Sequence, residues 1–96
     1  MNKVSIISLV TQVLNEYCKL NSIIVEISKD TPLIGANRIL DSMGLVNVIV
    51  DIETAFLDEN IEISLTSEAA MSGRISPFRT VGALCNFIAR QLEVEE

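Results

Sequence analysis

The fold of this chain is decided at residues 39–45, which are Ile39-Leu40-Asp41-Ser42-Met43-Gly44-Leu45. Apolar residues recur at helical spacing from this stretch to Phe56, so we predict a helix over residues 42–56. Asp41 or Ser42 can cap this helix, because the side-chain oxygen of either residue can accept a hydrogen bond from the first backbone N–H groups. The sequence therefore places an acid and a serine at the start of a long helix.

The predicted helix carries two apolar stripes, although a helix on the surface of a domain needs only one. The stripe expected to face the core consists of Leu45, Val48, Ile49, Ile52 and Phe56. The other, which we call the outer stripe, has the spacing i, i+3 and i+7 and consists of Met43, Val46 and Val50. Either the helix is buried nearly all round, or the outer stripe contacts partner proteins. So small a domain has little material to cover both faces, which favours partners.

Similar periodicity predicts helices at residues 3–20, 66–71 and 80–92. The apolar stripe of the first consists of Ile6, Val10, Val13, Leu14 and Tyr17, and that of the last consists of Val81, Leu84, Cys85, Ile88 and Leu92. Residues 23–27 have strand-like composition, but an isolated pair of strands is marginal, so we expect a long ordered loop there. The predicted fold class is all-α, a four-helix bundle with a short third helix, in a single domain spanning residues 1–96.

The composition excludes several classes of function. Thirteen acidic and seven basic residues give a net charge of −6, which argues against nucleic-acid binding and favours partners with basic surfaces, although solubility explains the charge equally well. The chain has no histidine, which excludes His-based triads and His-liganded metal sites. It also lacks the G-x-S-x-G and Ser-x-x-Lys patterns that activate a serine. We expect no catalytic residue and no metal site, and therefore no enzyme activity.

The cysteines and the hydropathy bear on location. Cys18 and Cys85 lie within apolar helical patterns without C-x-x-C spacing, so we expect buried free thiols in a reducing compartment. No apolar run reaches the roughly 18 residues that a membrane span needs, and the N-terminal residues lack the pattern of a signal peptide. We expect a cytoplasmic monomer without a membrane span.

The motif Asp41-Ser42-Met43, followed by an apolar helix, resembles the Asp-Ser-Leu attachment site of acyl carrier proteins. In that family the serine carries a 4'-phosphopantetheine arm, whose thiol holds acyl groups as thioesters. The segment Asp30-Thr31-Pro32-Leu33 also resembles the family, in which this leucine packs on the core. The resemblance extends over nearly the whole chain, in the order helix, long loop, Asp-Ser, helix, short helix and final helix.

The resemblance implies a free-standing carrier that contributes no catalytic group. A phosphopantetheinyl transferase, with Mg²⁺ of its own, would attach the arm from coenzyme A to Ser42, next to the motif acid Asp41. Further partners would be acyl-loading and acyl-processing enzymes with basic docking surfaces, in a fatty-acid, polyketide or other specialised acyl pathway. The residues implied in partner binding are Met43, Val46, Val50, Asp51 and Glu53.

The chain also departs from the family pattern, which leaves alternatives open. Gly44 and Asn47 stand where many fatty-acid carriers have acids, and the segment 63–81 is longer than in a typical carrier. Residues 40–44 also resemble D-alanyl carrier proteins, which load an amino acid on the same arm, so the cargo is acyl or aminoacyl. An alternative of another class is an unmodified helical interaction domain that binds its partner through the outer stripe.

Overall fold

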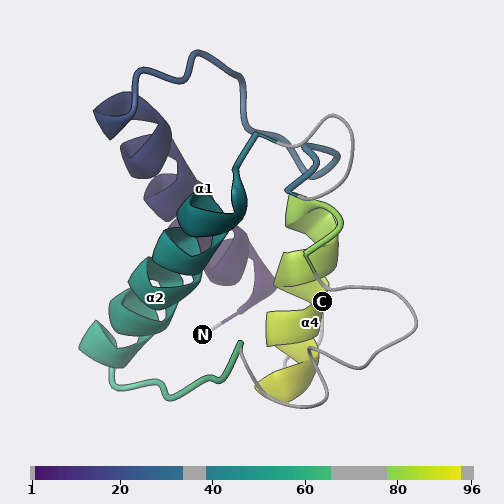
Figure 1. Ribbon diagram of the computed structural model, residues 1–96. Helices are drawn as coiled ribbons and strands as arrows, with labels where there is room; N and C mark the ends of the chain where they lie inside the picture. Colours follow the sequence, from purple (N-terminus) through teal and green to yellow (C-terminus); the bar gives the residue numbers. More distant parts are fainter. Residues whose placement is uncertain (1, 34–38, 66–77, 94–96) are drawn as a thin grey trace.

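A computed structural model of the chain describes residues 2–33, 39–65 and 78–93. In these residues it contains three α-helices and no strand (Figure 1): α1 at Lys3–Leu20, α2 at Ser42–Asp58 and α4 at Val81–Gln91. The predicted all-α class is confirmed for this part of the chain. Three of the four predicted helices are present. The remaining one, the short third helix predicted at residues 66–71, lies outside the described residues.

The bounds of the helices agree closely with those predicted from periodicity. The helix α1 has the predicted bounds, α2 continues beyond its predicted end at residue 56, and α4 is one residue shorter at each end than predicted. Thr80 is the N-cap of α4, because its hydroxyl accepts a hydrogen bond from the N–H of Ala83 at 3.1 Å. Asn2 caps α1 in the same way through the N–H of Ser5, at 2.8 Å. Both caps satisfy N–H groups that have no acceptor within the helix.

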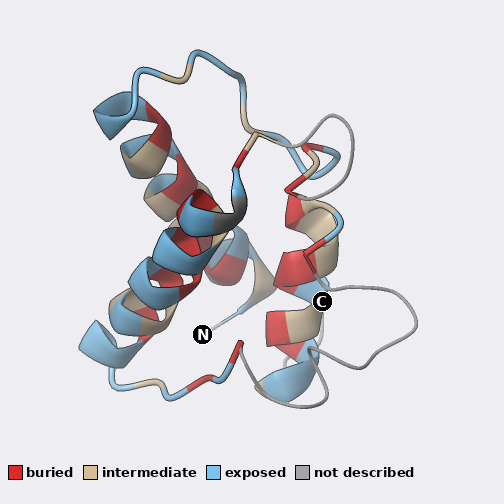
Figure 2. Cartoon of the chain, viewed as in Figure 1, coloured by how far each residue is buried: buried red, intermediate tan, exposed pale blue. Residues whose placement is uncertain are grey.

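The core lies between the three helices, and α1 packs against both α2 and α4. Figure 2 shows the buried residues on the helix faces that look toward one another. Four residues of the predicted stripes, Val13, Tyr17, Leu45 and Leu92, are only partly buried against this core. The buried core consists of Ile6, Val10 and Leu14 from α1, Val48, Ile49, Ile52 and Phe56 from α2, Val81, Leu84, Cys85, Ile88 and Ala89 from α4, and Leu33, Leu40, Ile63, Leu65 and Phe78 from the connections.

The connection between α1 and α2 has neither helix nor strand in its described residues, 21–33 and 39–41. The predicted loop at residues 23–27 is therefore confirmed. An isolated bridge joins Pro32 to Thr80, directly before α4. Leu33 is fully buried, as the resemblance to carrier proteins implies. The long connection is thus tied to the core near its middle.

Cys18 and Cys85 are both buried free thiols, as predicted. Across the described residues, no helix has both the length and the apolar character that crossing a membrane requires. The same part of the chain brings no three potential metal-ligating side chains together.

Candidate functional site

The Asp-Ser motif lies at the start of α2. Ser42 is the first residue of this helix and Asp41 is its N-cap. The Asp41 carboxylate accepts a hydrogen bond from the backbone N–H of Gly44 at 2.6 Å, and the Asp41 carbonyl accepts one from the N–H of Leu45 at 2.9 Å. Of the two caps that the sequence predicted, Asp41 is the one that the structure uses. The motif acid therefore holds the turn of backbone that carries Ser42.

The start of α2 is also a favourable place for a negative group. The first N–H groups of a helix lack acceptors within the helix, and the helix dipole places partial positive charge there. A phosphodiester attached at Ser42 would carry its charge at this end, where the dipole stabilises an anion by about 0.3–1 kcal/mol. Asp41 is exposed to solvent, so water and salt screen the repulsion between its carboxylate and that charge. A negative group attached at this helix start would therefore be stabilised by the end of α2.

Gly44 is buried where Tyr17 of α1 covers the first turn of α2. A Cβ atom at this position would overlap the Tyr17 hydroxyl, and would lie 3.0 Å from the Tyr17 Cζ and 3.1 Å from the Asp41 Oδ1. A side chain at residue 44 would therefore force Tyr17 to shift from its place over α2. The sequence identified Tyr17 only as part of a core stripe and Gly44 only as a departure from the carrier pattern. Their contact joins two segments that are distant in the sequence.

The outer stripe of α2 is exposed to solvent. The exposed fractions are 81 % for Met43, 60 % for Val46 and 53 % for Val50, so the interpretation of a helix buried nearly all round is wrong. Leu57 is 61 % exposed and lies on the same face, because its spacing from Val50 is close to two full turns. Leu57 was not among the residues predicted from the sequence for this surface. Large exposed apolar side chains that are contiguous are typical of sites that bind other proteins.

The two acids predicted beside the outer stripe differ in their surroundings. Asp51 is exposed and borders a hollow of about 530 Å³ between α1 and α2. Glu53 is partly buried, and its carboxylate accepts a hydrogen bond from the backbone N–H of Leu65 at 2.8 Å. Glu53 therefore holds residues 61–65 against α2, a structural role that the sequence did not indicate.

The capped helix start, Ser42 and the exposed stripe all belong to one helix, α2. A chain without histidine lacks the commonest general base for activating a serine itself. Comparisons with models of protein families, with curated proteins and with solved structures found no match to this chain.

Proposed function

We propose that this protein carries acyl groups as thioesters on a 4'-phosphopantetheine arm attached to Ser42. One observation carries the proposal: Asp41 caps α2, Ser42 is the first residue of that helix, and the exposed outer stripe begins directly after it. An enzyme that modifies Ser42 would thus find an apolar contact surface on the same helix. When bound, the arm supplies the thiol on which the thioester forms.

The chain's own residues fix the attachment point and provide the docking surface. Asp41 holds the first turn of α2 through the Gly44 N–H. The outer stripe supplies the apolar centre that protein interfaces use for most of their binding energy. At about 100° per residue, Asp51 and Glu53 fall on opposite sides of this stripe, where their charges attract a basic partner surface. The net charge of −6 acts in the same direction at longer range.

A carrier has no reaction to catalyse, so its contribution is positional. A cargo tethered to Ser42 meets each docked enzyme at a high effective concentration that the length of the arm determines. The rigidity of α2 favours this role, because its inner face is fixed by fully or almost fully buried residues such as Val48, Ile52 and Phe56. Docking through the outer stripe leaves that core untouched.

Incubation of the purified chain with coenzyme A and a broad-specificity phosphopantetheinyl transferase tests the proposal. We expect the intact mass to increase by the mass of one arm. Ser42→Ala should abolish the increase and should change the free energy of unfolding by no more than about 0.5 kcal/mol, because Asp41 provides the cap. A wild-type chain that no transferase modifies would contradict the proposal.

A second candidate is an unmodified interaction domain, which the exposure of Met43, Val46, Val50 and Leu57 favours. It differs from the carrier in needing no arm. Binding of a protein partner that Val46→Asn weakens, together with a failure of arm attachment, would identify this second function. The cargo is a separate question, and loading of the modified chain by acyl ligases or by D-alanyl ligases would separate an acyl carrier from an aminoacyl carrier.

A further inference from the structure

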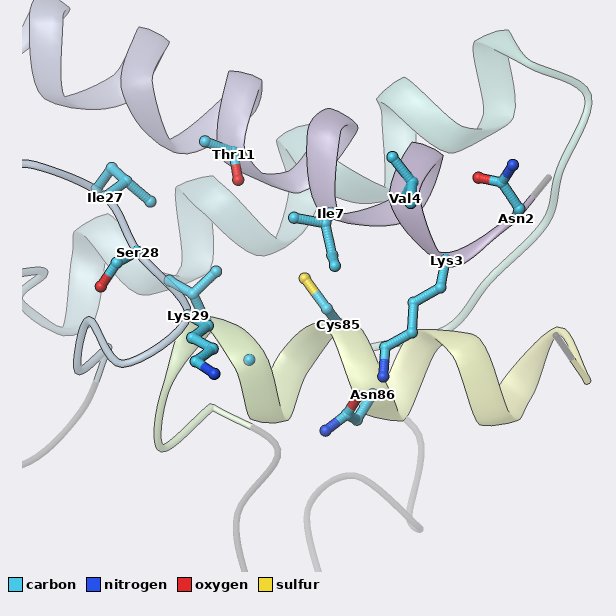
Figure 3. A pocket seen from close by; sticks show the side chains of 12 residues that line it. Asn2, Lys3, Val4, Ile7, Thr11, Ile27, Ser28, Lys29, Cys85 and Asn86 are labelled. Atoms are coloured by element: carbon cyan, nitrogen blue, oxygen red, sulfur yellow. The ribbon is translucent and has the colours of Figure 1, made fainter. Parts of the chain in front are cut away.

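A pocket of about 730 Å³ lies between α1 and α4 (Figure 3). Its volume is in the range of about 300–1,000 Å³ that is usual for small-molecule sites. Its walls come from the N-terminal half of α1, from residues 27–29 and from the start of α4, and in the described part of the chain no residue of α2 lines it. The side chains that form its apolar surface are Val4, Ile7, Ile27, Val81 and Cys85.

The charge of this pocket is opposite to that of the chain. Lys3 and Lys29 line it, and none of its lining residues, all of which belong to the described part of the chain, is an acid. Acids outnumber bases thirteen to seven in the whole sequence, and the nearby loop acids Glu26 and Asp30 are not among the lining residues. Burial raises the pKa of the Cys85 thiol to about 11, so at neutral pH this residue adds no negative charge.

The two lysines are arranged on either side of the apolar surface. In the view of Figure 3, Ile7 and Cys85 lie between Lys3, on α1, and Lys29, on the loop. A ligand seated on the apolar surface would therefore have a cation within its reach at each side. This arrangement complements a molecule that joins an apolar chain to an anionic group.

The loop wall of the pocket is fixed by hydrogen bonds. The N–H of Val81 donates to the carbonyl of Thr31 at 3.0 Å, and the N–H of Gly82 donates to the carbonyl of Lys29 at 2.8 Å. The buried Thr31 hydroxyl accepts a further bond from the N–H of Ser28, at 2.8 Å. A wall held in this way is ordered before a ligand arrives, which lowers the entropic cost of binding. Because these bonds use the first N–H groups of α4, an anion would be bound by the lysines and not by the helix end.

We propose that this pocket binds a single aliphatic chain with an anionic head group, of which a free fatty carboxylate is the simplest example. The aliphatic chain lies along Val4, Ile7 and Val81, and the head group lies at Lys29. The inference is independent of Ser42 and of α2, so it stands or falls separately from the carrier function.

Titration of the full chain with monomeric dodecanoate, followed by two-dimensional ¹H–¹⁵N NMR, tests the pocket. We expect the backbone amide signals of Ile7, Ile27 and Val81 to change their chemical shifts and to saturate as dodecanoate is added. Dodecyltrimethylammonium has the same chain length with a cationic head, and it should bind at least about tenfold more weakly. Lys29→Glu should weaken dodecanoate binding by about tenfold or more, because it turns an attraction into a repulsion.

Two further variants serve as controls. Ile7→Asn should weaken the binding of both amphiphiles without unfolding the chain, because Ile7 is already 44 % exposed. Lys19→Glu makes the same charge reversal at an exposed lysine of α1 outside this pocket, and it should leave dodecanoate affinity within about twofold of the wild type. Equal weakening by Lys19→Glu and Lys29→Glu would overturn the proposal, because it would reduce the effect to net charge.

Four other results would also overturn the proposal. The first is an absence of saturable binding, and the second is equal affinity for the anionic and cationic amphiphiles. The third is a set of shifts centred on the outer stripe of α2 instead of the pocket. Concentration-dependent shifts of Val4 and Ile7 without any amphiphile would show that a second copy of the chain covers this surface, and they too would overturn it.

Discussion

Val46 and Ile49 lie on opposite stripes of α2 and offer the sharpest comparison. Val46 is 60 % exposed and Ile49 is 5 % exposed. Ile49→Ala removes most of a core side chain and leaves a cavity, at an expected cost of about 2–5 kcal/mol. Val46→Asn should change the free energy of unfolding by no more than about 0.5 kcal/mol, because the site is exposed and the two residues have similar helix propensity. At about 4–8 °C per kcal/mol, Ile49→Ala should lower Tm by at least about 8 °C and Val46→Asn by less than about 4 °C.

The rate of arm attachment should show the reverse order for the same two variants. We expect Val46→Asn to slow attachment about tenfold, because it removes the apolar centre of the docking surface. Ile49→Ala should keep a rate near that of the wild type when both variants are assayed at a temperature at which they are folded. Circular dichroism supplies the Tm values and intact-mass spectrometry supplies the rates. Equal losses of Tm would refute the assignment of the two stripes, and equal rates would refute docking through the outer stripe.

Three further predictions concern contacts of individual side chains. Gly44→Ala should lower Tm, because the added Cβ atom would overlap the Tyr17 hydroxyl. The double variant with Tyr17→Phe should recover part of that loss. No recovery would argue against the contact. Glu53→Ala should lower the free energy of unfolding by about 1–3 kcal/mol, because the N–H of Leu65 loses its acceptor. Glu53→Gln keeps an acceptor oxygen and should lower it clearly less, as measured by denaturant unfolding. The reverse order would be inconsistent with this hydrogen bond. Burial raises the pKa of Cys85 to about 11, so its contribution to the free energy of unfolding should be constant below the ordinary thiol pKa of about 8.5 and should fall as pH rises toward 11. The free energy of unfolding of the Cys85→Ala variant should fall less steeply with pH over that range than that of the wild type. Identical pH profiles for the two proteins would contradict the burial of the thiol.

The helices could be predicted because their signals are local. The stripe that contains Ile6, Val10 and Leu14 repeats within one segment, and this repetition is enough to place α1. The start of α2 was predictable because Asp41 is a capping residue directly before an apolar run. Size favoured the exposure of the outer stripe, since so small a domain has little material to cover both faces of one helix.

The contacts between distant segments could not be predicted in this way. No local pattern indicates that the Glu53 carboxylate meets the N–H of Leu65, so the sequence identified Glu53 only as an acid for partner binding. The approach of Tyr17 to Gly44 depends on how α1 packs on α2. The pocket between α1 and α4 depends equally on packing, because its two lysines come from an N-terminal helix and a loop.

The attachment of the arm to Ser42 is tested most directly by peptide mass spectrometry after incubation with coenzyme A and a phosphopantetheinyl transferase. We predict one arm per chain, located on the peptide that contains Ser42. The Ser42→Ala variant should remain entirely unmodified while keeping a Tm close to that of the wild type. An arm located on Ser67, Ser72 or Ser76, or a chain that stays unmodified under conditions that fully modify a control carrier protein, would contradict the proposed function.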